Sequence, residues 1–126
     1  MYPVVQDRKI RVGIVGCGRI SKNHFASIAQ YPNDLELVAV CDLDSEVLEE
    51  HAARLAVPGY RDLEALLQKE RPDVLAICTP SGLHPSQTIL AARHGVHVVT
   101  EKPMATRWED GLRMVRACDE ARVRLF

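Results

Sequence analysis

The stretch from Ile10 to Ser21 constrains the fold of this chain more than any other. A short apolar run ends at Gly16, Gly18 follows two positions later, and a helix-like pattern then begins. Such a turn can bind a dinucleotide pyrophosphate, because glycines permit a tight bend and a close approach of phosphate, and the helix N–H groups face the negative charge. The third position of the pattern is Ser21 rather than Gly or Ala, so these residues also fit an ordinary strand–turn–helix connection.

Length and composition exclude several classes of protein. A chain of 126 residues predicts one domain, spanning residues 1–126, with enough length for its own core. The net charge is −1 and no basic run occurs, which argues against nucleic acid or an anionic membrane as a partner. The N-terminus lacks the apolar segment of a signal peptide, and no apolar run is long enough to span a membrane. We therefore expect a cytoplasmic protein.

The four cysteines are Cys17, Cys41, Cys78 and Cys118. Their spacing matches neither a zinc motif nor a CxxC redox pair, so no metal is expected. The first three fall near the ends of predicted strands and can lie close together. Small buried hydrophobic side chains are the better interpretation of all four.

Strand-like and helix-like segments alternate along the chain. We predict strands at residues 10–15, 35–41, 74–78 and 96–100, a very short strand around Tyr60, and helices at 19–30, 45–55, 63–70, 85–94 and 107–121. Because the strands are mostly apolar rather than alternating, they fit a parallel sheet with helices on both faces. The expected fold class is therefore α/β, a doubly wound parallel sheet of the nucleotide-binding type.

Two expectations concern the C-terminal part. Thr106 and Glu109 are spaced as a capping box, which predicts that Thr106 caps the last helix. Residues 123–126 look like the start of a further strand, and a strand that begins at a terminus suggests a truncated protein. The alternative is a complete short edge strand.

Asp42 follows the second predicted strand, where a carboxylate can accept hydrogen bonds from the adenosine ribose. A carboxylate there also repels the additional phosphate of NADP, and Asp44 adds to that repulsion, so NAD is the expected cofactor. Alternatively, this acidic segment only begins the next helix, with Asp44 or Ser45 as its N-cap.

The loop after the fourth predicted strand, residues 74–78, contains Thr79, Ser81 and His84. Loops after the first and fourth strands flank the crevice where the strand order reverses, so this loop is expected to border the cofactor. The alternative is purely structural, with Pro80 and Gly82 shaping a turn and His84 capping the helix that follows.

Glu101, Lys102 and Pro103 follow the next strand. A lysine beside a nicotinamide can exchange a proton with a substrate hydroxyl while hydride moves. A direct pair with Glu101 would keep the lysine charged, so we expect Glu101 to contact ribose or to orient the site. The Lys102–Pro103 bond is a candidate for cis geometry. By itself the segment is more typical of a surface Lys–Glu pair at the end of a strand.

Four motifs, Gly16-Cys-Gly-Arg-Ile-Ser, Cys41-Asp-Leu-Asp, Cys78-Thr-Pro-Ser-Gly-Leu-His and Glu101-Lys-Pro, follow four predicted strands in this order. Together they resemble the N-terminal half of the glucose–fructose oxidoreductase/inositol dehydrogenase (Gfo/Idh/MocA) family, over nearly the whole chain. The resemblance implies a Rossmann NAD-binding domain, with the family's second α/β domain absent from this chain. Residues 19–24 and 100–111 look most like sugar-nucleotide dehydrogenases that oxidise C3 of UDP-N-acetylglucosaminuronic acid.

The resemblance also implies a part for each motif residue. The cofactor-binding residues would be Gly16, Gly18, Arg19, Ile20 and Ser21 at the pyrophosphate, Asp42 at the adenosine ribose, Thr79, Ser81 and His84 at the border of the cleft, and Glu101 at the nicotinamide ribose. Lys102 would be the catalytic lysine. A sugar or sugar-nucleotide substrate is implied, and the missing domain would complete its pocket and the contacts of a homo-oligomer.

Two alternatives to this enzyme stay open from the sequence. One is an inositol or aldose-type dehydrogenase of the same family, which only the missing domain could distinguish. The other is a non-catalytic module that senses NAD(H), for which Lys102 would be dispensable.

Overall fold

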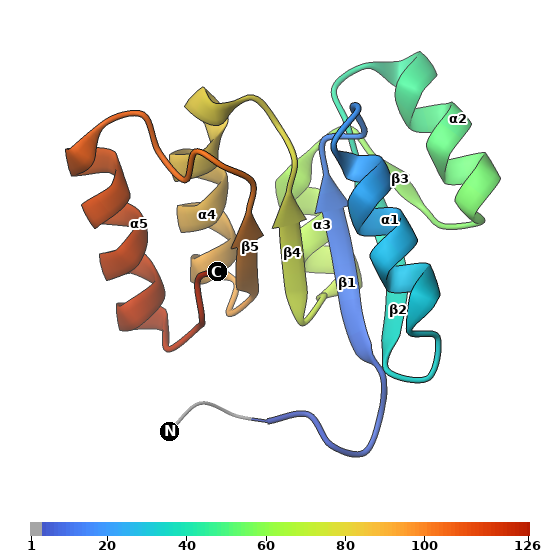
Figure 1. Ribbon diagram of the computed structural model, residues 1–126, viewed down its shortest axis with the longest axis horizontal. Coiled ribbons are helices and arrows are strands. Elements are labelled where there is room, and N and C mark those ends of the chain that lie inside the picture. Colours follow the sequence, from blue (N-terminus) through green and yellow to red (C-terminus); the bar gives the residue numbers. More distant parts are fainter. Residues whose placement is uncertain (1–3) are drawn as a thin grey trace.

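A computed structural model describes residues 4–126 and shows a five-stranded parallel sheet (Figure 1). The strand order is β3-β2-β1-β4-β5, and every neighbouring pair is parallel. The strands are β1 (Ile10–Val15), β2 (Leu35–Cys41), β3 (Gly59–Tyr60), β4 (Val74–Ile77) and β5 (His97–Thr100). The order reverses between β1 and β4, which confirms the predicted doubly wound architecture and places its crevice beyond the carboxyl ends of these two strands.

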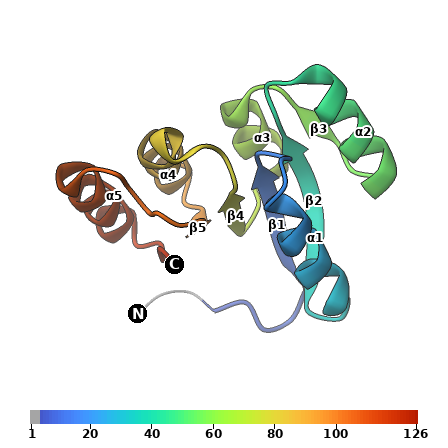
Figure 2. The same cartoon turned by 45° about the horizontal axis from the view of Figure 1, so that its top comes forward.

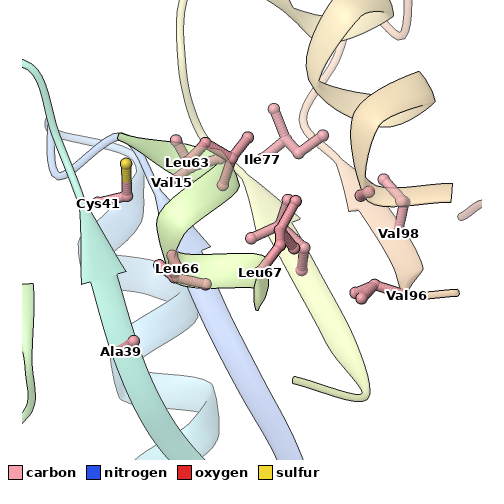
Figure 3. Close-up of a cluster of buried hydrophobic side chains, with 11 residues drawn as sticks. Val15, Ala39, Cys41, Leu63, Leu66, Leu67, Ile77, Val96 and Val98 are labelled. Atoms are coloured by element: carbon pink, nitrogen blue, oxygen red, sulfur yellow. The ribbon is translucent and has the colours of Figure 1, made fainter. Parts of the chain in front are cut away.

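Helices cover both faces of the sheet, as expected. They are α1 (Ser21–Gln30), α2 (Ser45–Leu55), α3 (Leu63–Glu70), α4 (His84–Arg93) and α5 (Trp108–Ala121). Alternate residues of a strand point to opposite faces, and the core divides accordingly. In β1, Ile14 packs in a cluster with α1 and α2, whereas Val15 packs in one with α3 and α4 (Figure 3). Helix α5 lies against α4, away from α1 and α2 (Figure 2).

Asp44 is the N-cap of helix α2, which is one of the two N-cap residues that the sequence suggested. The Asp44 carboxylate accepts hydrogen bonds from the backbone N–H groups of Glu46 and Val47. The capping box predicted for α5 is wrong, because Arg107 occupies the N-cap position and no side chain bonds the first turn there. The hydroxyl of Thr106 therefore does not cap this helix.

Other differences from the predicted elements lie at the carboxyl edge of the sheet. Helix α1 starts at Ser21 rather than residue 19, because residues 18–20 form the turn that leaves β1. A short 3₁₀ turn, Ser81–Leu83, separates β4 from α4. The last four residues run parallel to β5 but form only an isolated bridge, between Val98 and Leu125.

Asp73 connects the N-terminal segment to the opposite, amino edge of the sheet. Its carboxylate accepts hydrogen bonds from both terminal nitrogens of the Arg8 guanidinium at 2.7 and 2.9 Å, and from the backbone N–H of Arg11 at 2.8 Å. The hydrogen bond from Arg8 is the main cause that holds the pKa of Asp73 below its ordinary value of 3.8. The ionised form of Asp73 therefore stabilises the folded state.

We predict that Asp73→Asn lowers the melting temperature by a few degrees at neutral pH, since the Arg8 pair is exposed to solvent and weak. A carboxyl with a lowered folded pKa contributes its full stability above the unfolded value of 3.8 and loses it as the pH falls toward the folded value. The difference between the two proteins should therefore shrink below that pH in thermal unfolding experiments. A constant difference across the acid range would contradict this account.

Candidate functional site

The glycine turn after β1 lies directly against the end of β4. Gly16 has φ +89°, and a Cβ added to it would lie 2.7–2.8 Å from the carbonyl group of Cys78 and the backbone nitrogen of Thr79. No side chain fits in that space, and the backbone conformation itself favours glycine. Around Gly18, by contrast, an added Cβ would meet nothing within 4 Å. Gly16 thus serves packing, whereas Gly18 leaves open space at the surface.

Helix α1 presents free donors at its N-terminus. The backbone N–H groups of Gly18, Arg19 and Ile20 have no hydrogen-bond partner within residues 4–126, and all three residues are exposed. No side chain caps the helix and its first turn has no acidic residue. The buried hydroxyl of Ser21 donates to the carbonyl of Gly18 and so stabilises the turn from inside. Unpaired N–H groups at a helix N-terminus make a site for an anion such as a phosphate.

Asp42 fixes this turn to the end of β2. Its Oδ2 accepts a hydrogen bond from the backbone N–H of Cys17 at 2.8 Å, and its Oδ1 accepts one from that of Asp44 at 2.9 Å. Each oxygen of a carboxylate has a further lone pair. Since Asp42 is only partly buried, those lone pairs can accept hydrogen bonds from a ligand's hydroxyl groups.

A cavity of about 450 Å³ opens at this edge of the sheet. It brings together four residues that the sequence indicated, namely Gly16, Gly18, Asp42 and Thr79. Its wall also includes three residues that the sequence analysis missed, namely Leu43, Arg61 and Leu63. Arg61 and Leu63 follow β3, which has only two residues. The end of this short strand at the same edge was the only signal in the sequence that could have placed them at the site. A larger hollow of about 620 Å³ lies at the opposite edge, around Arg8 and Asp73.

The loop after β4 is fixed by hydrogen bonds within the protein. The hydroxyl of Thr79 donates to the side-chain oxygen of Gln87, and both residues line the cavity. Ser81 is partly buried and begins the 3₁₀ turn. The ring of His84 is buried, with Nε2 at 2.8 Å from the carbonyl oxygen of Thr79 and Nδ1 at 2.9 Å from that of Pro103.

His84 therefore lies behind the cavity wall rather than in it. Its two ring nitrogens bridge the loops that follow β4 and β5, and neither faces open space. The sequence pattern located this residue beside the site but could not show that its ring partners are backbone groups 5 and 19 residues away.

The segment after β5 places Glu101 and Lys102 at the same edge. The Lys102–Pro103 bond is cis, which confirms the geometry suggested by the sequence, and Lys102 is exposed. Glu101 contacts His24 of α1, with Oε1 at 2.6 Å from Nε2. The hydrogen bond from His24 is the main cause that lowers the pKa of Glu101, and the nearby Lys102 lowers it further. No role was predicted for His24 from the sequence, because its partner Glu101 lies 77 residues away in the chain.

The three cysteines near the strand ends pack beneath the turn. Cys17, Cys41 and Cys78 are buried, and burial is the main cause that raises the pKa of each thiol to about 12. A thiol that stays protonated is a poor nucleophile and metal ligand. No cluster of three or more metal-ligating side chains exists in the described part of the chain. These thiols are therefore small buried hydrophobic groups, as predicted.

Residues 10–126 match the family model described as an oxidoreductase family with an NAD-binding Rossmann fold. The chain belongs to the Gfo/Idh/MocA oxidoreductase family. As a member, it is an NAD-binding Rossmann domain, and its glycine turn, free helix N–H groups and Asp42 fit the phosphates and ribose of that cofactor. Within the described residues, no helix is long and apolar enough to cross a membrane.

Three relatives show how the chain compares with known members of the family. The WlbA dehydrogenase from Bordetella pertussis, solved in complex with NADH and UDP-GlcNAcA, is 55% identical with a TM-score of 0.95, over 98% of this chain and 37% of that one. D-glucoside 3-dehydrogenase of Escherichia coli is 38% identical over 97% of this chain and 34% of that protein. Myo-inositol 2-dehydrogenase of Thermotoga maritima is 30% identical over 93% and 35%, respectively. The chain thus spans about a third of the length of these relatives.

We predict that Gly16→Ala destabilises the fold by about 2 kcal/mol or more, because the methyl group would overlap the end of β4 at a left-handed position. Gly18→Ala is the matched control and should change the free energy of unfolding by less than about 0.5 kcal/mol, since its site is open. Urea unfolding of both variants measures the difference. Equal losses would show that the turn does not pack against β4 as described.

We predict that His84→Phe lowers the free energy of unfolding by about 2–3 kcal/mol, because the ring nitrogens that contact the carbonyl oxygens of Thr79 and Pro103 are lost, and at least one of these carbonyl groups then lacks its hydrogen-bond donor. Ser86→Ala, an exposed change on the same helix, is the control and should be nearly neutral. Urea unfolding again provides the measurement. Stability equal to that of the control would contradict the bridging part of His84.

Proposed function

We propose that this chain is the cofactor-binding part of a dehydrogenase that transfers hydride between a sugar-nucleotide carbon and NAD. The observation that carries the proposal is the joint placement of three free N–H groups, Asp42 and a cavity at one edge of the sheet. The likeness to the WlbA dehydrogenase, crystallised with NADH and UDP-GlcNAcA, supports a UDP-N-acetylhexosaminuronate as the substrate. The likeness to D-glucoside 3-dehydrogenase supports a C3 alcohol as the reacting group.

The pyrophosphate of NAD would lie at the glycine turn. There the backbone N–H groups of Gly18, Arg19 and Ile20 would donate to its oxygens, and the open space at Gly18 would admit them. Gly16 and Ser21 would act from beneath, by shaping the turn rather than by touching the cofactor with a side chain. The exposed Arg19 would also add a positive charge near the phosphates.

Asp42 would bind the hydroxyl groups of the adenosine ribose through its free lone pairs. An NADP molecule in the same place would bring its additional phosphate against the carboxylates of Asp42 and Asp44. Like charges at close range in a partly buried site repel, so NAD is favoured. Thr79 and Ser81 would border the cofactor from the loop after β4, with His84 supporting that loop from behind.

When bound, NAD⁺ accepts the hydride that leaves the alcohol carbon as its C–H bond breaks. Lys102 would take the hydroxyl proton on a neutral Nζ, so that the alcohol becomes a ketone. Glu101 would hold the nicotinamide ribose. Because the relatives are about three times longer, we infer that residues outside this chain complete the substrate pocket.

We predict that the 126-residue chain binds NADH at least about tenfold more tightly than NADPH, since a charge repulsion of about 1.4 kcal/mol already gives that ratio. Titration of NADH and NADPH fluorescence measures both affinities. Asp42→Ala should reduce the preference, whereas Asp34→Ala, an exposed carboxylate elsewhere, should leave it unchanged.

The same chain should show no NAD-dependent oxidation of UDP-N-acetylglucosaminuronate.

Absence of NADH binding, or a preference for NADPH, would overturn the cofactor assignment. A measurable rate from this chain would overturn the inference that residues outside it complete the active site.

A further inference from the structure

The pair of His24 and Glu101 joins two elements that the sheet does not make neighbours. His24 lies in the first turn of α1, directly after the glycine turn, and Glu101 follows β5. In the sheet, β4 separates β1 from β5. The contact of 2.6 Å between Nε2 and Oε1 therefore crosses the end of β4 and links the first and last segments of the cofactor edge.

The direction of this hydrogen bond follows from the charge of Glu101. Its carboxylate is ionised at neutral pH, because its pKa is lowered, chiefly by His24, and it can then only accept hydrogen bonds. Nε2 of His24 must therefore carry a hydrogen and donate it. The negative charge of Glu101 also helps to raise the pKa of the buried Cys78 thiol, behind the main effect of burial.

This arrangement bears on the lysine next in the chain. Glu101 is the nearest carboxylate to Lys102 in sequence, and a direct ion pair between them would favour the charged amine. The side chain of Glu101 is instead held by His24, and within residues 4–126 Lys102 forms no salt bridge. Each partner of the pair has 23% of its side chain exposed, so the contact is shielded from most of the solvent.

We infer that His24 is a positioning residue for the Glu101-Lys102-Pro103 segment. It holds the Glu101 carboxylate across the end of β4, toward α1, and thereby keeps Glu101 from forming a salt bridge with the Lys102 amine at the cofactor edge. This inference rests on the proposed function, because it is the NAD-dependent reaction that gives Glu101 and Lys102 their parts.

The pair itself is tested without any cofactor. In the 126-residue chain, the carboxyl carbon of Glu101 can be followed by NMR while the pH is lowered. Its midpoint should lie below the ordinary value of 4.5 in the parent chain and move up toward that value in His24→Phe. His24→Gln keeps a side-chain N–H donor and should retain part of the downward shift. An unchanged midpoint in His24→Phe would overturn the inference.

Binding of NADH tests the consequence. His24→Phe and Glu101→Gln should each weaken NADH binding by about three- to tenfold, and the double variant should be no weaker than the poorer single one, as expected of residues that act as a unit. His24→Gln should recover most of the affinity. Asn23→Ala, an exposed neighbour on α1, is the matched control and should bind like the parent.

The two proposals fail in different ways. If the parent binds NADH and His24→Phe binds it equally well, the positioning inference is wrong and the proposed function stands. If the parent does not bind NADH, the proposed function fails and the inference falls with it. Additive losses in the double variant would also overturn the inference, because the two side chains would then act separately.

Discussion

The turn at Gly16 lies against the backbone at the end of β4 with no room for a side chain between them. This contact brings the chain that leaves β1 against the neighbouring strand, and the N–H groups of residues 18–20, just beyond it, have no hydrogen-bond partner in the described part of the chain. Asp42, at the end of β2, accepts a hydrogen bond from the backbone N–H of Cys17 and so joins β2 to this turn. The ends of three strands are thereby fixed to one another by backbone contacts and one carboxylate. The cavity and the donors at this edge depend on that arrangement.

Most of the fold could be predicted from the sequence, because strand and helix signals here are local. Apolar runs gave the four longer strands, and the reversal of strand order followed from the rules for parallel sheets. The first turn of α5 could not be predicted, because a Thr–Glu spacing says nothing of whether the backbone at Thr106 is placed to be a cap. The part of Arg61 and Leu63 in the cavity was also missed, since it depends on β3, a strand of only two residues.

The candidate site was located more accurately than its contacts. Gly16, Gly18, Asp42 and Thr79 were indicated by motifs, and they line one cavity. The contacts of His24 and His84 could not be predicted in this way, because the partners of both rings lie in segments far apart in the chain. Cofactor contact by each predicted residue stays a prediction, as do the cytoplasmic location and a homo-oligomer. The family match gives the class of the protein, an oxidoreductase with an NAD-binding domain. Neither the hydrophobic periodicity nor the spacing of the motifs could have identified the substrate.

Asp42 has a consequence for any attempt to engineer cofactor preference. A redesign toward NADP would replace this acid with a neutral or basic residue. The same carboxylate accepts hydrogen bonds from the backbone N–H groups of Cys17 and Asp44, so its removal leaves one amide at the glycine turn and one at the start of α2 without an acceptor. The proposed selectivity for NAD and the stability of the turn would thus depend on the same side chain. A productive variant would need a second substitution that supplies the lost acceptor, and laboratory evolution should find the two changes together.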